Sequence, residues 1–136
     1  MVPSLGNFSL WLALCFAIFQ FVISCKKNNQ STLYLNRIAA NGLLLCAFLS
    51  FLSLMYSYLV SDFSVVNVFQ NSHTTKPLLY KISGVWGNHE GSMLLWILVL
   101  TLFNYFIFKL LDKKNSVFIL KTLESQAFIT FGFLLF

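Results

Sequence analysis

The sequence predicts an all-α membrane protein with about four transmembrane helices and a short amphipathic helix in a long connecting segment. Two observations lead to this fold class. Apolar residues make up 58% of the 136-residue chain and charged residues only 10%, whereas soluble domains usually carry about 25% charged residues. The apolar residues also gather in long stretches, and a helix that spans a bilayer needs roughly 17–25 of them. We therefore interpret residues 1–136 as a single helical membrane module.

Four apolar stretches are the expected membrane spans: residues 8–24, 38–60, 93–111 and 117–136. The two middle stretches are long enough to cross a bilayer unaided. The first is near the lower limit unless its helix starts around Leu5. The last contains Lys121 and Glu124, so it spans only if its charged end lies at a membrane surface, with the lysine reaching toward water.

Residues 61–92 form the longest connection, which is too long for a hairpin and is not expected to lack structure. From Pro77 onward, apolar side chains recur at helical spacing, and proline suits the first helical position. With Tyr80 and Trp86 at headgroup level, the segment predicts a short amphipathic helix lying in the membrane interface. A helix buried against protein is the alternative. The apolar face consists of Leu78, Leu79, Ile82, Val85 and Trp86.

Basic residues in short loops predict which side of the membrane each loop faces. The connections after the first and third spans are basic, whereas in residues 61–92 Lys76 and Lys81 are offset by Asp62 and Glu90. This pattern places the N-terminus and residues 61–92 on the intermembrane-space or periplasmic side. It also explains the net charge of +5 without a role in nucleic-acid binding. The basic residues of the inner connections are Lys26, Lys27, Arg37, Lys113 and Lys114, with Lys109 just before the second of them.

The segment GVWGNHEGSMLLW, residues 84–96, holds the strongest candidates for a site. A bilayer penalises each unsatisfied polar group by several kcal/mol, so His89 and Glu90 at the start of a span either help the helix to begin or belong to a site. Asn88 is a good N-cap, and an acid in the first turn is stabilised by the helix dipole. A structural role therefore competes with a functional one. The candidate residues are Trp86, Gly87, His89, Glu90, Gly91, Ser92 and Trp96.

The sequence contains no self-sufficient active site. Cys15, Cys25 and Cys46 lack the C-x-x-C and C-x-x-C-H spacings of redox motifs and haem attachment. There is no phosphate loop, catalytic triad or zinc spacing, and no charge in mid-span that would mark a transport pathway. We therefore expect no catalytic residue and no metal site. Polar residues within the spans are expected to form interhelical hydrogen bonds: Gln20, Asn41, Thr101, Asn104, Gln126 and Thr130.

Residues 84–96 closely resemble the W-G-x-H-E-G-S-[LM]-L-L-W segment of CcmF, the haem lyase family that attaches haem to apocytochrome c. The resemblance covers most of the chain in order. The Trp-rich haem-handling segment of the family and its haem-ligating histidines lie downstream of the matched region, and His89 does not correspond to one of those ligands. Further similar residues are Leu5-Gly6-Asn7, Ser61-Asp62-Phe63, Asn71-Ser72, Pro77, Tyr80 and the final Phe-Gly-Phe-Leu-Leu-Phe.

The resemblance implies a non-catalytic N-terminal subunit of a membrane haem lyase complex in cytochrome c maturation. Its partners would be apocytochrome c, the lipid bilayer and other lyase fragments that carry the Trp-rich segment and the ligand histidines. Haem would be bound in the assembled complex, and none by this chain alone. The alternative is a structural subunit of a larger inner-membrane respiratory assembly, derived from such a lyase and without haem chemistry.

The composition also suggests where the protein resides. Sixteen Phe, together with many Asn, Lys, Leu and Ile, are the bias that an AT-rich coding sequence produces. The N-terminus has neither the basic region and cleavage site of a signal peptide nor the Arg-rich pattern of a transit peptide. We expect a mitochondrially encoded protein of the mitochondrial inner membrane, with the bacterial inner membrane as the second choice.

Overall fold

A computed structural model of the chain describes residues 2–25, 30–110 and 116–135. Four long helices, α1 (Val2–Ser24), α2 (Gln30–Val60), α5 (His89–Leu110) and α6 (Ser116–Leu135), carry most of these residues. Two short helices, α3 (Val66–Asn71) and α4 (Leu78–Gly84), lie in the connection between α2 and α5. All four long helices are long and apolar enough to cross a membrane. The predicted fold class is therefore confirmed.

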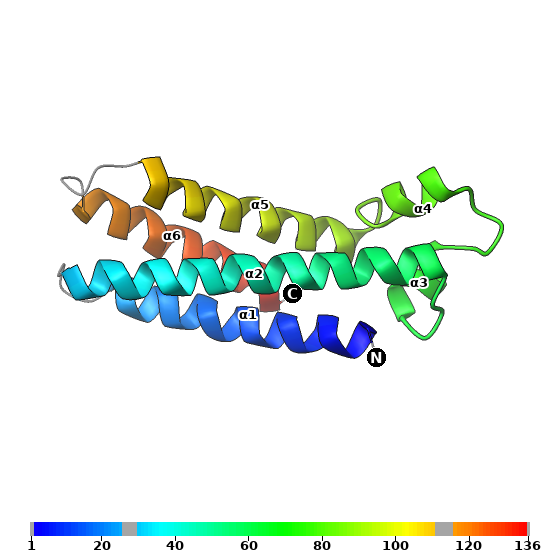
Figure 1. The fold of residues 1–136 in the computed structure, drawn as a ribbon, viewed down its shortest axis with the longest axis horizontal. Helices are drawn as coiled ribbons and strands as arrows, with labels where there is room; N and C mark the ends of the chain where they lie inside the picture. The colour runs from blue at the N-terminus through cyan, green and yellow to red at the C-terminus, as the bar shows by residue number, and fades with distance from the viewer. Residues whose placement is uncertain (1, 26–29, 111–115, 136) are drawn as a thin grey trace.

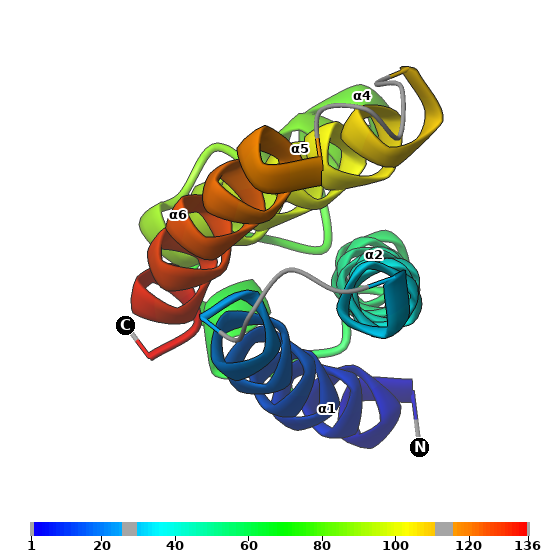
Figure 2. The ribbon, with the colours of Figure 1, turned by 90° about the vertical axis from the view of Figure 1, so that its left-hand side faces the viewer.

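The four long helices form an antiparallel bundle (Figure 1). Viewed from the end, they lie in the ring order α1, α2, α5, α6 (Figure 2). Each long helix accordingly packs on two others: α1 on α2 and α6, and α5 on α2 and α6. The two short helices lie at the same end of the bundle, on either side of the end of α2 in this view (Figure 1).

Close packing of α1 against α2 depends on small residues and on one polar contact near each end. A Cβ on Gly6 would lie 2.5 Å from the Ser53 hydroxyl oxygen. The Ser53 hydroxyl donates to the Val2 carbonyl at 2.8 Å, and at the other end the Ser24 hydroxyl donates to Asn36 Oδ1 at 3.0 Å. Small residues allow helix backbones to approach closely in a membrane, where van der Waals packing holds helices together.

Two helix starts differ from the predicted spans. α1 begins at Val2 and not at residue 8, and α2 begins at Gln30 and not at residue 38. The expectation that residues 30–37 belong to a connection was wrong. Asn36 is fully buried and paired with Ser24, so a polar residue within this stretch packs into the bundle and extends the helix. The predicted spans 93–111 and 117–136 correspond to α5 and α6, and the residues Lys26, Lys27, Lys113, Lys114 and Phe136 lie outside the described part of the chain.

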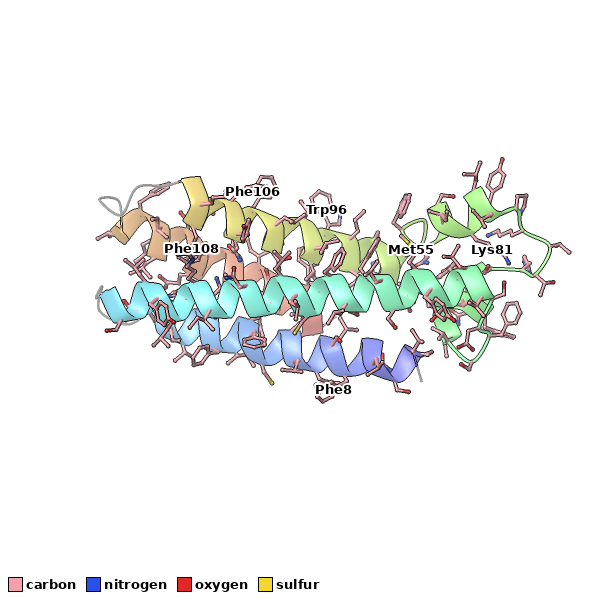
Figure 3. The ribbon with its side chains drawn as sticks, in the orientation of Figure 1. Phe8, Met55, Lys81, Trp96, Phe106 and Phe108 are labelled. Carbon is pink, nitrogen blue, oxygen red and sulfur yellow. The ribbon has the colours of Figure 1, made fainter. Side chains whose placement is uncertain are left out.

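Large apolar side chains cover the outside of the bundle. Phe8, Trp96 and Phe106 project away from neighbouring helices (Figure 3) and are 63%, 59% and 45% exposed. A helix that is apolar on all sides belongs in lipid or in a protein core. The charged end of α6 is paired, because Lys121 Nζ lies 2.7 Å from Glu124 Oε2. The chain is thus a multi-pass membrane protein.

The connection between α2 and α5 contains the predicted helix, α4, and an unpredicted one, α3. Pro77 is the N-cap of α4, with ψ of 150°, and not its first helical residue. The predicted apolar face is split between two environments, because Val85 is fully buried whereas Leu78 and Leu79 are 64% and 77% exposed. Exposed leucines next to the exposed Tyr80 suit a membrane interface, so the interfacial location remains a prediction.

Candidate functional site

An apolar cluster holds the connecting segment against the end of the bundle. Tyr58 at the end of α2 and Val85 after α4 are both fully buried, and they pack with residues of α3 and α5. Burial of aliphatic and aromatic side chains is the main favourable term in such packing. The cluster thereby brings four elements that are separate in the sequence to one place. Its buried members are Phe51, Tyr58, Val68, Val85 and Leu94.

Three polar side chains, those of Tyr58, Asn67 and Asn88, form a hydrogen-bond network that shares Tyr58 with this cluster. The Tyr58 hydroxyl donates to Asn67 Oδ1 at 2.5 Å, and Asn88 Nδ2 donates to the Tyr58 oxygen at 2.7 Å. Asn88 Nδ2 also lies 3.0 Å from Asn67 Oδ1 and 3.0 Å from the Gly84 carbonyl. Tyr58 is fully buried and Asn67 is 8% exposed. Because α2, α3 and the start of α5 each supply one member, the network fixes how these elements sit relative to one another.

The start of α5 is built as the sequence predicts. Asn88 Oδ1 accepts a hydrogen bond of 2.7 Å from the backbone N–H of Gly91, which is the N-cap interaction. Glu90 lies in the first turn, where the helix dipole stabilises a negative charge. Its Oε2 accepts a hydrogen bond from Asn67 Nδ2. Glu90 therefore serves both the helix and the network, although its own side chain is exposed.

One glycine of the motif, Gly91, is required by close packing, and a second, Gly84, packs tightly against a neighbouring ring. A Cβ on Gly91 would lie 1.6 Å from the Val85 carbonyl oxygen, closer than any real contact. A Cβ on Gly84 would lie 3.3 Å from the ring of Tyr58. Gly91 thus allows the chain before α5 to fold back onto the first turn of that helix. Gly87 lies between them, and its N–H donates to the Ser83 carbonyl at 3.1 Å.

The seven predicted site residues do not form one cluster. Glu90 joins the network and Gly91 receives its cap, whereas Trp86 and Trp96 are 41% and 59% exposed. His89 is the first residue of α5 and is exposed, and its carbonyl accepts the Ser92 hydroxyl at 2.8 Å. Sequence reasoning missed Tyr58 and Asn67, which lie outside the motif. The one available signal was an isolated amide in the otherwise apolar stretch Val65–Phe69.

The turn after α2 supports the same region. Ser61 has a positive φ of 57°, and Asp62 accepts hydrogen bonds from the Ser64 hydroxyl at 2.6 Å and the Ser64 N–H at 3.1 Å. The bond from the Ser64 hydroxyl, and to a smaller extent the bond from its N–H, holds the pKa of the Asp62 carboxyl below its usual range. Lys81 Nζ donates to the Ser61 hydroxyl oxygen at 2.6 Å. The basic residue of α4 is therefore tied to the end of α2.

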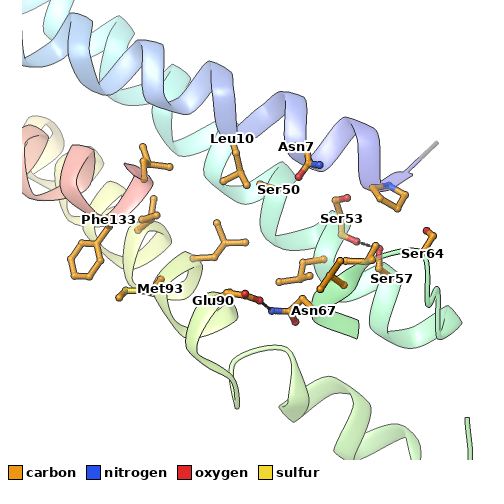
Figure 4. Close-up of a pocket in the computed structure, with 18 residues that line it drawn as sticks. Asn7, Leu10, Ser50, Ser53, Ser57, Ser64, Asn67, Glu90, Met93 and Phe133 are labelled. Atoms are coloured by element: carbon orange, nitrogen blue, oxygen red, sulfur yellow. Dashed lines mark hydrogen bonds between the residues drawn. The ribbon is translucent and has the colours of Figure 1, made fainter. Parts of the chain in front are cut away.

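Beside the network lies a pocket of about 500 Å³ (Figure 4). Its polar lining residues, which are serines of α2, Asn7 of α1, Asn67 and Glu90, lie toward the end of the bundle that carries α3 (Figure 4). Met93, one turn after Glu90 on α5, and Phe133 near the end of α6 line the pocket farther along the bundle (Figure 4). Its volume is within the range of small-molecule sites. The lining residues on which this description rests are Asn7, Leu10, Ser50, Ser53, Ser57, Asn67, Glu90, Met93, Ile97, Phe133 and Leu134.

The residues of the pocket do not fit a haem group. Haem iron is held by His, Cys, Met or Tyr, and among the described lining residues only Met93 is of these types. The same lining contains no Lys or Arg that would pair with the propionates. Within residues 2–25, 30–110 and 116–135, no three His, Cys, Asp or Glu gather to hold a metal ion. The pocket lining therefore offers shape and hydrogen bonds, and Met93 is its one side chain of a type that binds haem iron.

Comparison with known proteins identifies the family. No family model matches the chain. The cytochrome c-type biogenesis protein CycK of Bradyrhizobium diazoefficiens is 40% identical over the whole of this chain, and CcmF of Haemophilus influenzae is 34% identical over the same extent. A solved structure of the cytochrome c haem lyase CcmF covers 98% of the chain with a TM-score of 0.89 and 29% identity. The chain is a homologue of the CcmF and CycK cytochrome c-type biogenesis proteins.

The chain matches only part of each relative's length. The chain spans 21% of the CycK relative, 22% of the Haemophilus CcmF and 23% of the solved CcmF chain. The resemblance inferred from residues 84–96 is confirmed. These relatives are bacterial proteins of cytochrome c biogenesis.

Proposed function

We propose that the chain is a non-catalytic subunit of a membrane haem lyase complex in cytochrome c maturation. The observation that carries the proposal is the backbone likeness to CcmF over 98% of the chain, at a TM-score of 0.89. The bundle and the capped start of α5 are what this chain contributes. Reactive groups would come from other chains or segments of the complex, since the pocket lining fits no haem iron.

The contribution of this chain is to hold one end of its bundle, formed by the end of α2, by α3 and α4 and by the start of α5, in one shape. In the proposed orientation this is the outer end of the bundle. The Tyr58–Asn67–Asn88 network joins α2, α3 and α5 through side chains whose hydrogen bonds are satisfied. Satisfied buried networks make a structure rigid and specific. A rigid rim would position the partner chains and apocytochrome c for haem attachment. Haem in the assembled complex, the partner lyase fragments and the mitochondrial inner membrane are parts of this proposal.

The experiment that tests this function is purification of the tagged full-length chain from its native membrane in mild detergent. We expect Trp-rich lyase fragments to co-purify, and depletion of the chain to lower the amount of haem-stained c-type cytochromes. A companion variant, Asn67→Leu, should lower cytochrome maturation while the exposed His73→Ala does not. Recovery with respiratory-complex subunits and an unchanged cytochrome content would instead support the structural-subunit alternative.

The proposed orientation has a separate test. A cysteine at Asn71 should react with an impermeant thiol reagent added from the intermembrane-space or periplasmic side. A cysteine at Asn29, which lies outside the described residues, should react only after the membrane is permeabilised. Labelling of position 29 alone from the outer side would reverse the orientation and remove the pocket from the side where apocytochrome c is handled.

A further inference from the structure

The interior of the bundle contains polar side chains that the site above does not use. Gln20 of α1, Asn104 of α5 and Thr130 of α6 are each fully buried. Five of their side-chain atoms have no hydrogen-bond partner among the described residues: Gln20 Nε2 and Oε1, Asn104 Nδ2 and Oδ1, and Thr130 Oγ1. The expected interhelical hydrogen bonds from these residues are therefore not present. Buried polar groups in folded proteins almost always have a partner, in protein or in ordered water.

Gln20 and Thr130 lie at the same depth in the bundle. The rings of Phe21 and Phe128 are 6.1 Å apart, and Cys25 Sγ lies 3.6 Å from Glu124 Oε1. Both pairs set the same antiparallel register between α1 and α6, in which each step along α1 matches one step back along α6. In this register Gln20 lies level with residues 129–130.

Asn104 lies within about one helical turn, 5.4 Å, of that level. A groove between α2 and α5 is lined by residues 41–48 of α2 and residues 98–105 of α5. Because these helices are antiparallel (Figure 1), we infer that Asn41 lies about level with Tyr105 and Phe48 about level with Leu98. Asn104 is then level with Gly42, where an added Cβ would meet the ring of Phe16 on α1. The three polar residues therefore lie at similar depths in the bundle, each on a different helix.

Small side chains lie near these groups. Four of the buried residues at about this depth are alanines, whose methyl groups accept and donate no hydrogen bonds and take up little volume, and Gln126 Oε1 of α6, one turn from Thr130, is also buried without a partner among the described residues. A polar site holds a water molecule when it is roomy enough and supplies two to four hydrogen-bonding groups. The alanines are Ala17, Ala39, Ala40 and Ala127.

We propose that Gln20, Asn104 and Thr130 form a binding site for ordered water inside the membrane-spanning bundle. The amides donate and accept, and the hydroxyl does both, so a small water cluster satisfies all five atoms. Full burial within this chain keeps the site separate from any interface with lipid or a partner. Ile97 of the pocket lining, the fully buried Thr101 and Asn104 follow one another on one face of α5, so this face leads from the pocket to the proposed site.

The test is hydroxyl-radical footprinting of the full-length chain in nanodiscs, in which bound water generates the radical beside buried side chains. Leu43, which is fully buried and one residue from Gly42, is the reporter. We expect Leu43 to be modified in the wild-type chain. The variant Gln20→Met/Asn104→Leu, which keeps side-chain size and removes the polar atoms, should lose that modification. The milder Thr130→Val should lower it and covers the case in which the double variant does not fold.

Asn41→Leu is the matched control, because Asn41 is an exposed amide on α2 near the same depth. This variant should leave Leu43 modification unchanged, and exposed Tyr80 should be labelled equally in every sample. An unmodified Leu43 in the wild-type chain would overturn the proposal and favour direct pairing among the three side chains. Modification that survives both Gln20→Met/Asn104→Leu and Thr130→Val would overturn it as well.

Discussion

The end of the bundle that carries α3 and α4, which the proposed orientation makes the outer end, differs from the interior in how its amides are paired. At the outer end, Asn67 and Asn88 exchange hydrogen bonds with each other, with Tyr58 and with backbone groups. In the interior, Gln20 and Asn104 have no partner among the described side chains. Both regions bury polar groups next to apolar helices, where an unsatisfied group is costly.

The difference follows from the elements that each region can draw on. The outer end has two short helices and a turn, so backbone carbonyls and N–H groups are available beside the side chains. The interior has only long helices, whose backbone groups are bonded within each helix. A buried amide there can share a helix carbonyl, pair with another side chain or bind water: Asn36 donates to the Thr32 carbonyl at 3.1 Å and accepts from the Ser24 hydroxyl, whereas Gln20 and Asn104 have no such partner among the described residues. Polar groups at the outer end therefore fix how α2, α3 and α5 are arranged, while Gln20, Asn104 and Thr130 in the interior form the proposed site for water.

The largest effect is expected from Gly91→Ala at the outer end. The new Cβ would lie 1.6 Å from the Val85 carbonyl oxygen, and because that atom is backbone, the start of α5 must move. We expect a loss of at least about 3 kcal/mol in the free energy of unfolding, measured as a lower melting temperature in nanodiscs.

Gly132→Ala is the matched control, because nothing lies within 4 Å of its added Cβ. In a helix this change should be neutral or stabilise by roughly 0.5 kcal/mol. Equal melting temperatures for both variants would show that the outer end does not depend on the close approach at Gly91.

The second effect concerns the network itself. Asn67→Leu preserves side-chain size and removes hydrogen bonds to Tyr58, Asn88 and Glu90. We expect a loss of about 2 kcal/mol, since buried groups remain without partners, and faster hydrogen exchange in α3. Asn71→Leu, which removes one bond to a backbone carbonyl, should cost only about 0.5 kcal/mol. If the two variants unfold alike, the outer network adds no stability beyond local bonds.

A smaller effect is expected from Glu90→Gln. The amide oxygen still accepts from Asn67, while the charge at the first turn of α5 is lost. We expect a loss of roughly 0.5 kcal/mol at low salt that shrinks at high salt, because the helix-dipole interaction is screened. A salt-independent loss as large as that of Asn67→Leu would assign the effect to the hydrogen bond and not to the charge.

The smallest effect is expected from His89→Ala. His89 is exposed and is not part of the pocket lining. The absorption spectrum of haem in the assembled complex should therefore keep its Soret position and intensity. Met93→Leu tests the one lining residue that could bind iron, and it should also leave the spectrum unchanged. A shifted Soret band with His89→Ala alone would make this residue a haem ligand.

Much of the candidate site was readable from residues 84–96, because helix entry is local chemistry. Asn88 caps α5, Glu90 lies in the first turn, and Gly91 sits where the chain folds back. Tyr58 and Asn67 could not be found in this way. They come from other helices, and no local pattern indicates which side chain three elements away will meet an amide.

The sequence alone determined the membrane class, the approximate spans and the likeness to CcmF, because apolar length and a continuous motif are properties of the chain itself. Only the tertiary structure decided that α2 begins at Gln30, that α3 exists, and that Tyr58, Asn67 and Asn88 meet. The structure also places Gln20, Asn104 and Thr130 within about one helical turn of one another in depth, without hydrogen bonds between them. The reason is physical: hydropathy reports the transfer of each residue from water to lipid, whereas hydrogen-bond partners depend on the register in which separate helices pack.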